Sequence, residues 1–574
     1  MNTAEVREMQ ITGRHAILRQ CLTDGITYMF GNPGTVEQGF LDALSVHPEM
    51  RYILTLQESV ALLCADGYAR ATQRPALVQL HSSPGIGNAV GALYQAKRGH
   101  APLLVIAGDA GLKYMNMDAQ MAADLVAMME PVTKYATMVL DPHNLLRTLR
   151  RAIKIAATPP MGPVYVCLPA DVLDAVNEEP VFPSSIPSTR AQPEAALAEQ
   201  AAAMLADAER PAIFFGDGVA WSGAGETLLQ LAEQWGAEVW GADTGDQSFD
   251  SRHPCYQGTT GHMFGGHSLP ITKNPDRILI VGTYMLPEVF PELGEIFGPG
   301  AKVVHIDLNA YEIAKNHRVD LGMVCDPKCG LQTLRGKLEE RMTPQAKQQA
   351  KNRGEHLKQA QTARVATAAE KDAAEAAKEQ ATMEAFAAIL ARRLPDDAII
   401  FDEALTNSPA LTRAIPQRPG HYFCTRGGSL GVGFPGAIGA KLAHPLRTVV
   451  GFSGDGGSMY TIQALYTAAK YRLDTTFVVC HNRRYKLLDL NIQEYWSEQQ
   501  IPSHAFPAVF DLSQPVLGFC DMARGMGVES VHVERAEEIE PAIDRALRHD
   551  GPFLIDLFLE ANTTDHKPGC KCGQ

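Results

Sequence analysis

Short apolar runs alternate with longer amphipathic stretches along the first part of the chain. Apolar runs bounded by glycine, proline or polar residues are typical of buried parallel strands, and the stretches between them have the length of helices. Within residues 10–188 such runs occupy 76–81, 102–108 and 163–169. This alternation predicts an α/β domain in which helices cover a parallel sheet.

The same alternation returns twice further along the chain. Strand candidates occupy 212–218, 277–282 and 302–308 in the second segment, and 398–403, 447–453, 475–481 and 553–560 in the third. A Pro- and Ser-rich stretch at 178–196 predicts a linker, and an Ala-, Glu-, Lys- and Gln-rich stretch predicts an exposed helical connector. The fold class expected is α/β, with three domains of parallel sheet flanked by helices. The expected boundaries are 1–188, 195–345 and 383–560 for the domains, 346–382 for the connector and 561–574 for a tail.

Charge and composition exclude several classes of partner. The chain has 51 Lys plus Arg against 65 Asp plus Glu, a formal net charge of −14, so we expect no nucleic-acid partner. No apolar run approaches the roughly 20 residues of a membrane helix. The first residues lack a basic region followed by an apolar one, which favours a cytoplasmic location without a membrane partner. Cys570, Cys572 and His566 in the tail are too few ligands to predict a metal site.

One stretch combines glycines with two polar residues at strand ends. Gly454-Asp455-Gly456-Gly457 follows one strand candidate, and the next strand candidate ends at Asn482. Both polar residues then fall at the carboxyl ends of parallel strands, where open α/β sheets bind ligands. Glycines and a helix N-terminus suit a phosphate, while carboxylate and amide oxygens suit Mg²⁺. The stretch predicts a diphosphate held through magnesium.

A second Gly-Asp-Gly sequence in the chain provides a comparison. Gly216-Asp217-Gly218 also follows a strand candidate, but the position at the same spacing as Asn482 is Thr244. Without the amide oxygen the second sequence predicts a structural turn.

The Gly-Asp-Gly sequence followed at this spacing by Asn resembles the thiamine-diphosphate motif of the 2-oxo acid decarboxylase and acetolactate synthase family. The resemblance implies Mg²⁺ ligands at Asp455, Asn482 and the main-chain carbonyl of Arg484. The family has Asn where this chain has His481, and Ser where it has Gly457. The further contacts to thiamine diphosphate that the resemblance implies are Thr406, Gly454, Gly456, Gly457, Tyr460 and Tyr485.

Two more segments resemble this family. The stretch 52–70 resembles the segment in which a Glu, here Glu58, binds the aminopyrimidine ring. The stretch 424–442 resembles the loop in which a carbonyl, here that of Gly428, accepts from the ring's amino group, and Leu430 supports the bent cofactor. The resemblance implies a pyrimidine-binding, a central Rossmann-like and a diphosphate-binding domain. Because the family joins the first domain of one subunit to the last of another, it also implies an obligate homodimer, with a homotetramer expected.

Within the family, the segments 30–40, 80–93 and 161–169 resemble benzoylformate decarboxylase most. In that branch a Ser ending the GNPG turn contacts the substrate carboxylate, and here that position is Thr35. In that branch the His of a Leu-His-Ser sequence after a strand moves protons near the thiazolium, and here it is His81. With Glu58, these residues form the catalytic set that the resemblance implies.

One departure from that branch concerns a second active-site His in the central domain. The comparable stretch 281–293 has none, and Val289 lies near its place. His262 or His267 could replace it from a neighbouring loop. The residues Leu487 to Asn491 also differ from the aromatic pattern of the substrate loop.

The expected function is therefore the thiamine-diphosphate- and Mg²⁺-dependent, non-oxidative decarboxylation of a benzoylformate-like 2-oxo acid through a C2 ylide and an enamine. One alternative is a carboligase of the acetolactate-synthase kind, and another is an enzyme acting on 2-hydroxyacyl thioesters. The central domain's pattern permits FAD but contains no decisive flavin signal. A cofactor-binding protein without catalysis would not need Glu58, Asp455 and Asn482 together. The hypothesis that the chain is a nicotinamide dehydrogenase rests only on Gly85, Gly87 and Gly91, and their spacing does not match the dinucleotide fingerprint.

Overall fold

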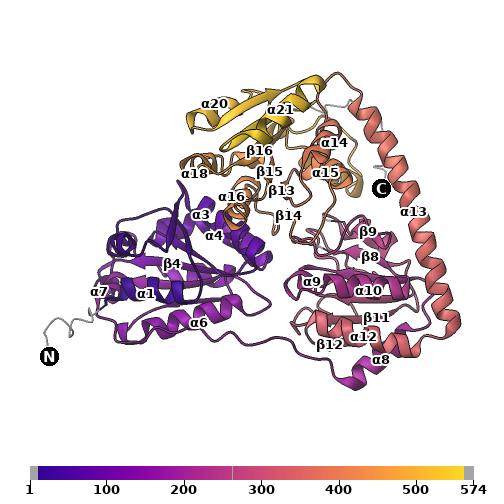
Figure 1. The fold of residues 1–574 in the computed structure, drawn as a ribbon, viewed down its shortest axis with the longest axis horizontal. Coiled ribbons are helices and arrows are strands. Elements are labelled where there is room, and N and C mark those ends of the chain that lie inside the picture. Colours follow the sequence, from indigo (N-terminus) through magenta and orange to yellow (C-terminus); the bar gives the residue numbers. More distant parts are fainter. Residues whose placement is uncertain (1–10, 243, 262, 561–574) are drawn as a thin grey trace.

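The computed structural model describes residues 11–242, 244–261 and 263–560. They form three six-stranded sheets in which every strand pair is parallel. Figure 1 shows the three sheets as separate bodies, with helices covering both faces of each. The predicted fold class is confirmed.

The first sheet has the strand order β2-β1-β3-β4-β6-β5. Its strands β3 and β6, which both lie inside the sheet, are buried along their whole length, which explains why they read as continuous apolar runs. Helices α1 (Gly13–Thr23), α3 (Glu58–Thr72), α4 (Ser82–Arg98) and α6 (Leu145–Ala157) cover it. The strands are β1 (Tyr28–Gly31), β2 (Arg51–Leu54), β3 (Ala76–Leu80), β4 (Leu103–Asp109), β5 (Tyr135–Met138) and β6 (Val164–Pro169).

The second sheet has a different order, β12-β11-β10-β7-β8-β9. Helices α8 (Ala195–Leu205), α9 (Asp217–Trp221), α10 (Gly225–Trp235) and α12 (Pro327–Arg341) flank it. Its strands are β7 (Pro211–Phe215), β8 (Glu238–Gly241), β9 (Tyr256–Thr259), β10 (Arg277–Val281), β11 (Lys302–Asp307) and β12 (Leu321–Val324).

The third sheet, β14-β13-β15-β16-β18-β17, repeats the order of the first. Its flanking helices include α14 (Met383–Arg393), α15 (Ser408–Ala414), α16 (Gly433–Ala443), α18 (Ala464–Lys470), α20 (Phe519–Gly525) and α21 (Ala536–Arg548). Its strands are β13 (Ile399–Glu403), β14 (Tyr422–Cys424), β15 (Val449–Gly454), β16 (Thr475–His481), β17 (Glu529–Val533) and β18 (Phe553–Phe558).

A long helix, α13 (Pro344–Ala376), connects the second domain to the third. It runs along the right-hand edge of the molecule in Figure 1. Of its described residues only Ala350 is buried. Arg353 fixes the helix to the second domain by donating to the carbonyls of Ala208, Trp235 and Gly236. The domain boundaries predicted above stay predictions.

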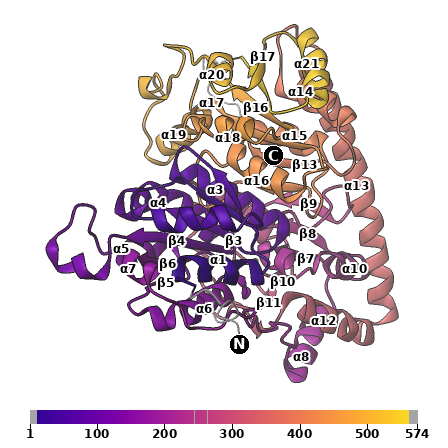
Figure 2. The same cartoon turned by 60° about the vertical axis from the view of Figure 1, so that its left-hand side comes forward.

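The first and third domains pack together through α3 and α16, which lie side by side in Figure 2. Glycines make this approach close. A Cβ on Gly67 would lie 2.2 Å from the carbonyl oxygen of Gly436, and one on Gly439 would lie 2.0 Å from the carbonyl oxygen of Cys64. Larger side chains at these positions would force the two helices apart.

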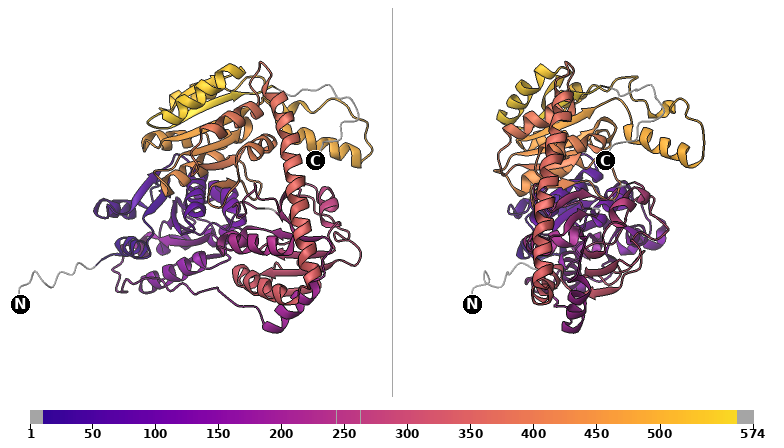
Figure 3. Two further views of the ribbon diagram at one scale, coloured as in Figure 1. Left: turned by 45° about the vertical axis from the view of Figure 1, so that its right-hand side comes forward. Right: turned by 90° about the vertical axis from the view of Figure 1, so that its right-hand side faces the viewer.

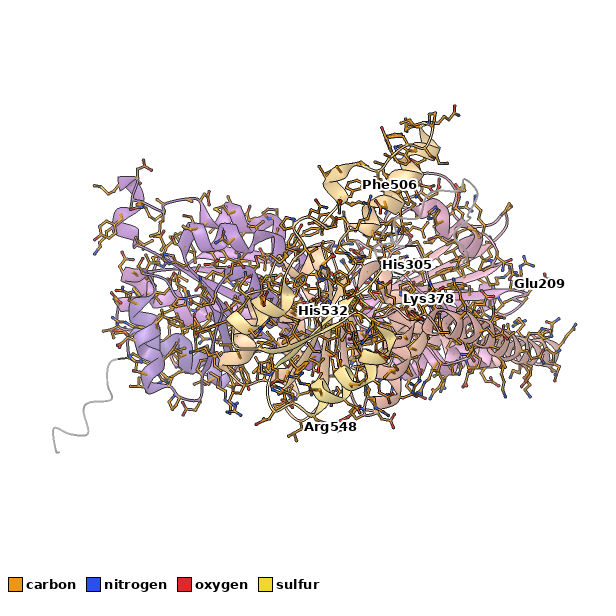
Figure 4. The ribbon with its side chains drawn as sticks, turned by 90° about the horizontal axis from the view of Figure 1, so that it is seen from above. Glu209, His305, Lys378, Phe506, His532 and Arg548 are labelled. Atoms are coloured by element: carbon orange, nitrogen blue, oxygen red, sulfur yellow. The ribbon has the colours of Figure 1, made fainter. Side chains whose placement is uncertain are left out.

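Helix α19 (Lys486–Glu498) and the segment after it project from the third domain (Figure 3). Phe506, labelled in Figure 4, stacks on Trp496 at a ring separation of 5.7 Å and lies under the Arg484 guanidinium. Each helix in the described ranges is too short or too polar to cross a lipid bilayer.

Candidate active site

Glu58 lies at the start of α3, just beyond the carboxyl end of β2. Its side chain is buried, and each carboxylate oxygen accepts one amide hydrogen bond. Asn32 Nδ2 donates to Oε1 at 3.1 Å, and Asn88 Nδ2 donates to Oε2 at 3.0 Å. The two amides come from the loop after β1 and from α4, so the carboxylate is held from two elements. Sequence analysis did not identify either Asn, because each is remote from Glu58 in the chain.

His81 precedes α4 at the carboxyl end of β3 and contacts a buried acid. Its Nδ1 lies 2.9 Å from Oε2 of Glu37, whose Oε1 accepts from the backbone N–H of Gly108 at 2.9 Å. An ionised carboxylate only accepts, so this contact fixes the His81 proton on Nδ1 and leaves Nε2 to exchange protons. Burial raises the pKa of Glu37 above its usual value, and the His81 contact opposes this shift.

Glu58 and His81 lie next to each other across one turn of α4. A Cβ on Gly85 would lie 3.3 Å from His81 Cβ and 3.4 Å from Glu58 Cγ. Gly85 is the fourth residue of α4 and packs against both side chains. The dehydrogenase hypothesis gains no support here, because the spacing of Gly85, Gly87 and Gly91 misses the dinucleotide fingerprint.

Thr35 lies in the loop between β1 and α2 (Gln38–Ala43) and is exposed. The preceding residue packs on the imidazole, because a Cβ on Gly34 would lie 1.9 Å from His81 Nδ1. The loop that carries Thr35 is thus held against His81. Glu37, two residues further on, is the functional candidate that the sequence reasoning missed. A charged residue just after the GNPG turn is the signal that could have drawn attention to it.

Asp455 follows β15, and its buried carboxylate is held by backbone N–H groups. Oδ1 accepts from Gly456 at 2.7 Å, and Oδ2 accepts from Arg483, which follows β16. Asn482 Oδ1 accepts from the N–H of Arg484 at 3.0 Å. Burial raises the pKa of Asp455. The three residues of the predicted metal set therefore meet at the carboxyl ends of two paired strands.

The glycines after Asp455 pack closely on neighbouring side chains. A Cβ on Gly456 would lie 2.3 Å from the ring of Tyr485, and one on Gly457 would lie 3.0 Å from Ser453 Oγ and 3.4 Å from Glu403 Oε1. The family's Ser in place of Gly457 would therefore need its neighbours to shift. Tyr460 is 58% exposed, and Thr406 and Gly454 are half-buried.

The loop before α16 depends on glycine for its conformation. Gly427, Gly428 and Gly431 have φ of 68°, 75° and 91°, which side-chain-bearing residues rarely adopt. Gly428 is exposed and Leu430 is half-buried. At the far end of the loop, the buried Glu403 accepts from the N–H groups of Gly431 and Gly433. Sequence reasoning missed Glu403, which ends β13.

These residues fit thiamine diphosphate and Mg²⁺ in their donor chemistry. Asp455 brings a buried carboxylate held by backbone N–H groups, Asn482 an amide oxygen and Arg484 a carbonyl oxygen, and oxygen ligands are those that Mg²⁺ prefers. In the part of the chain that the structure describes, no cluster of three His, Cys, Asp or Glu could hold a metal, so a mixed set of this kind is the candidate. Gly454, just before Asp455, has no atom within 4 Å of the position of a Cβ, so a phosphate could approach its backbone closely.

The second Gly-Asp-Gly sequence has a structural role at a junction of all three domains. Asp217 is buried, accepts from the N–H groups of Gly245 and Asp246, and pairs with Arg426 at 3.1 Å. Arg70 from α3 pairs with Asp246 and donates to the carbonyl of Cys424. Charges from the three domains thus neutralise one another in the interior.

Of the two proposed substitutes for the missing His, His267 lies in a 3-10 helix (Gly265–Ser268). Its Nε2 lies 3.5 Å from a carboxylate oxygen of Glu494 on α19, and its side chain is largely exposed. Val289 is 57% exposed. His262 and the tail with Cys570, Cys572 and His566 lie outside the described residues.

A cavity of about 410 Å³ lies at the start of α4, one residue after His81 in the chain. Ser82 forms one wall, and the loop between β4 and α5 (Leu125–Met129) forms much of the rest, with Tyr114, Met115 and Met121. Ser83 Oγ donates to the carbonyl of Met121 at 2.7 Å and ties this loop to α4. The volume is within the range of small-molecule sites.

Three family models match the chain in order. Residues 11–128 match the thiamine pyrophosphate enzyme N-terminal TPP binding domain, 198–335 the central domain and 407–557 the C-terminal TPP binding domain. The strands and helices described above lie largely within these matches.

Two kinds of relative match the chain over nearly its whole length. The chain is 31% identical to a benzoylformate decarboxylase of Pseudomonas aeruginosa, over 97% of this chain and 99% of that protein. It is 28% identical to the acetolactate synthase isozyme 3 large subunit of Escherichia coli, over 96% and 95%. Among solved structures, a thiamine diphosphate-dependent 4-hydroxybenzoylformate decarboxylase of Rhodococcus jostii is 26% identical with a TM-score of 0.81, over 96% of this chain and 99% of that one.

Proposed function

The chain belongs to the thiamine pyrophosphate enzyme family, and from this premise we propose that it decarboxylates a 2-oxo acid without oxidation, using thiamine diphosphate and Mg²⁺. The observation that carries the proposal is the pair formed by His81 and the buried Glu37 next to Glu58. A decarboxylase that releases an aldehyde must deliver a proton after CO₂ leaves, and an imidazole with one nitrogen fixed on an acid can do so through the other.

When bound, thiamine diphosphate supplies a nucleophilic carbon and an electron sink for the pair left by CO₂. The chain's own residues have separate tasks. Glu58, aligned by Asn32 and Asn88, orients the aminopyrimidine and holds a proton at a carboxylate oxygen. His81 gives and takes a proton at Nε2, and the Thr35 hydroxyl orients the substrate carboxylate. Asp455, Asn482 and the Arg484 carbonyl hold Mg²⁺.

We also propose that the cofactor is contacted by the remaining residues that the resemblance implies. These are Thr406, Gly428, Leu430, Gly454, Gly456, Gly457, Tyr460 and Tyr485. Tyr485 supports this, because its ring packs on the segment that would hold the diphosphate. The cavity next to Ser82 takes the organic group of the acid, since Tyr114, Met115 and Met121 contribute apolar groups to its lining.

A homodimer is the proposed minimal active unit. Within one chain, Gly427 packs on Gln95 and Arg98 near the end of α4, whereas Glu58 is bound by Asn88. Glu58 and the Gly428 carbonyl are both expected to contact one aminopyrimidine ring. The proposal that these contacts come from different copies rests on the resemblance, in which the first domain of one subunit faces the last domain of another. A tetramer and a cytoplasmic location stay predictions.

The test is to measure CO₂ and the organic product from a panel of 2-oxo acids, with thiamine diphosphate and Mg²⁺. The panel includes benzoylformate, pyruvate and branched acids, with and without an acceptor aldehyde. An aldehyde as the main product supports the proposal. A hydroxyketone would assign the chain to the carboligases instead, and turnover only of a 2-hydroxyacyl thioester would assign it to lyases of that substrate. A colourless preparation would count against FAD.

A further inference from the structure

Glu403 is a buried acid at the carboxyl end of a strand of the third sheet, and the proposed reaction does not use it. It is the last residue of β13 and only 1% exposed. Its carboxylate contacts three groups from two other elements. Oε1 accepts from the N–H of Gly431, and Oε2 accepts from the N–H of Gly433 at 2.7 Å and from Ser453 Oγ at 3.2 Å.

The contacts of Glu403 lie on both parts of the proposed cofactor site. Gly431 and Gly433 end the loop that carries Gly428 and Leu430. Ser453 lies two residues before Asp455, and Gly457 lies so close that a Cβ there would be 3.4 Å from Glu403 Oε1. Gly431 is also held from its other side, because Thr461 Oγ1 donates to its carbonyl at 2.6 Å.

We propose that Glu403 is a positioning residue that couples the aminopyrimidine loop to the diphosphate segment, so that its ionised carboxylate sets the affinity for thiamine diphosphate. The inference rests on the proposed function. A carboxylate can accept from both glycine N–H groups and from Ser453 at once. An amide or a protonated acid carries hydrogen on one side and cannot accept there, so one loop contact is lost.

The charge state of Glu403 is sensitive to its surroundings. Burial raises the pKa of Glu403 to about 7, the three hydrogen bonds oppose the shift, and the charge of Asp402 adds to it. The groups in contact with the carboxylate are uncharged: two N–H groups from the loop, the Ser453 hydroxyl from β15 and the backbone of Gly457. Asp402 points to the other side of β13, where it accepts from Tyr422, Ser408 and the N–H of Ala404.

The experiment is direct titration of the full chain with thiamine diphosphate and Mg²⁺ by calorimetry, from pH 6 to 8.5. For Glu403→Gln we expect an affinity about 10-fold or more below wild type at pH 8.5, where the wild-type carboxylate is ionised. Towards pH 6 the two should converge, because wild type then also carries a neutral group. A general loss of folding would not produce this convergence.

Two further variants keep Glu403 and should shift, in opposite directions, the pH at which the affinity for thiamine diphosphate falls. Ser453→Ala removes a hydrogen bond that lowers the pKa of Glu403, so the fall in affinity should begin at a higher pH. Asp402→Asn removes a charge that raises the pKa, so the fall should begin at a lower pH. The Asp402 side chain is also buried but bonds to Tyr422, Ser408 and Ala404 rather than to the loop, so Asp402→Asn also shows what the loss of a buried carboxylate does to stability.

The results separate the two proposals. If wild type binds the cofactor but all variants share its affinity and pH dependence, the positioning role of Glu403 is wrong and the proposed function stands. If wild type fails to bind thiamine diphosphate at every pH, the proposed function is wrong. If Glu403→Gln does not fold, opposite shifts in Ser453→Ala and Asp402→Asn support the role, and no shift in either refutes it.

Discussion

Replacing Glu37 by Gln tests whether His81 works through its acidic partner. In the structure, the Glu37 carboxylate accepts from His81 Nδ1 and from the N–H of Gly108, both at 2.9 Å, and it is 3% exposed. Gln is nearly the same size, so the packing is kept. Its amide can present a donor to Nδ1, which would favour the tautomer with the proton on Nε2 and remove the proton acceptor from the reacting side.

The size of the effect follows from the kind of bond that is lost. A hydrogen bond to a buried charged group contributes about 1.5–3 kcal/mol. If this is lost from a proton transfer that limits turnover, kcat should fall by roughly 10- to 100-fold. Thiamine diphosphate affinity should change little, because Glu37 contacts His81 and not the proposed cofactor contacts.

The pH dependence has a defined sign. Burial raises the pKa of Glu37, so in wild type the carboxylate is protonated at a pH above the usual 4.3 or so of glutamate. Activity should fall as the pH drops through this raised value. Stability should move in the opposite direction, because the folded state binds the proton more readily than the unfolded state and its charge-burial cost is relieved. In Glu37→Gln both dependences should be absent.

The assay is the pH profile of kcat and kcat/KM for the best 2-oxo acid, with urea unfolding measured at the same pH values. Thr133→Val is a matched control, because this side chain is also buried in the first domain and bonds only to a backbone carbonyl of its own helix end. Equal kcat and an unchanged acid limb in Glu37→Gln would refute the role assigned to the pair.

Four other changes have defined outcomes. Glu58→Gln should lower kcat by at least about 100-fold while calorimetry still detects cofactor binding; full turnover would contradict the assigned role. Removal of Mg²⁺ by a chelator should abolish thiamine diphosphate binding reversibly, and Asp455→Asn should show weak binding at any Mg²⁺ concentration tested. Arg70→Met leaves the buried Asp246 without its partner and should destabilise the chain by about 3–5 kcal/mol in urea, a loss that Asp246→Asn in the same chain should partly restore.

The fully buried strands could be predicted from the sequence because their residues are almost all apolar. β3, β6, β15 and β16 are buried almost throughout, so each reads as an apolar run. Strands such as β12, which alternates buried and exposed residues, and β14, which has three residues, leave too weak a pattern. Their place is set by pairing with a neighbouring strand, which the local sequence does not encode.

The candidate site also has residues that a local sequence pattern marks and residues that it does not. Asp455 and Asn482 follow strands and lie among glycines, so a local pattern marks them. Glu37 and Glu403 become informative only through partners distant in the chain, which are His81 and Gly431. A single Asp or Glu in a sequence can be an ordinary surface residue. Only its tertiary contacts show that it is buried and hydrogen-bonded.

The loop between β14 and α16 shows how the two kinds of information combine. Its glycines mark it as unusual in sequence, but glycines alone give a flexible chain. The structure restrains it at both ends: Arg426 pairs with Asp217 of the second domain, and its N–H donates to Gln95 of the first, while Gly431 and Gly433 bind Glu403. Between these anchors Gly428 remains exposed. An exposed Gly428 between two anchored ends is what the proposed contact with a second copy of the chain requires. The pairing of Asp217 with Arg426 also explains why the turn at Asp217 keeps a buried charge although it lacks the amide of a metal site.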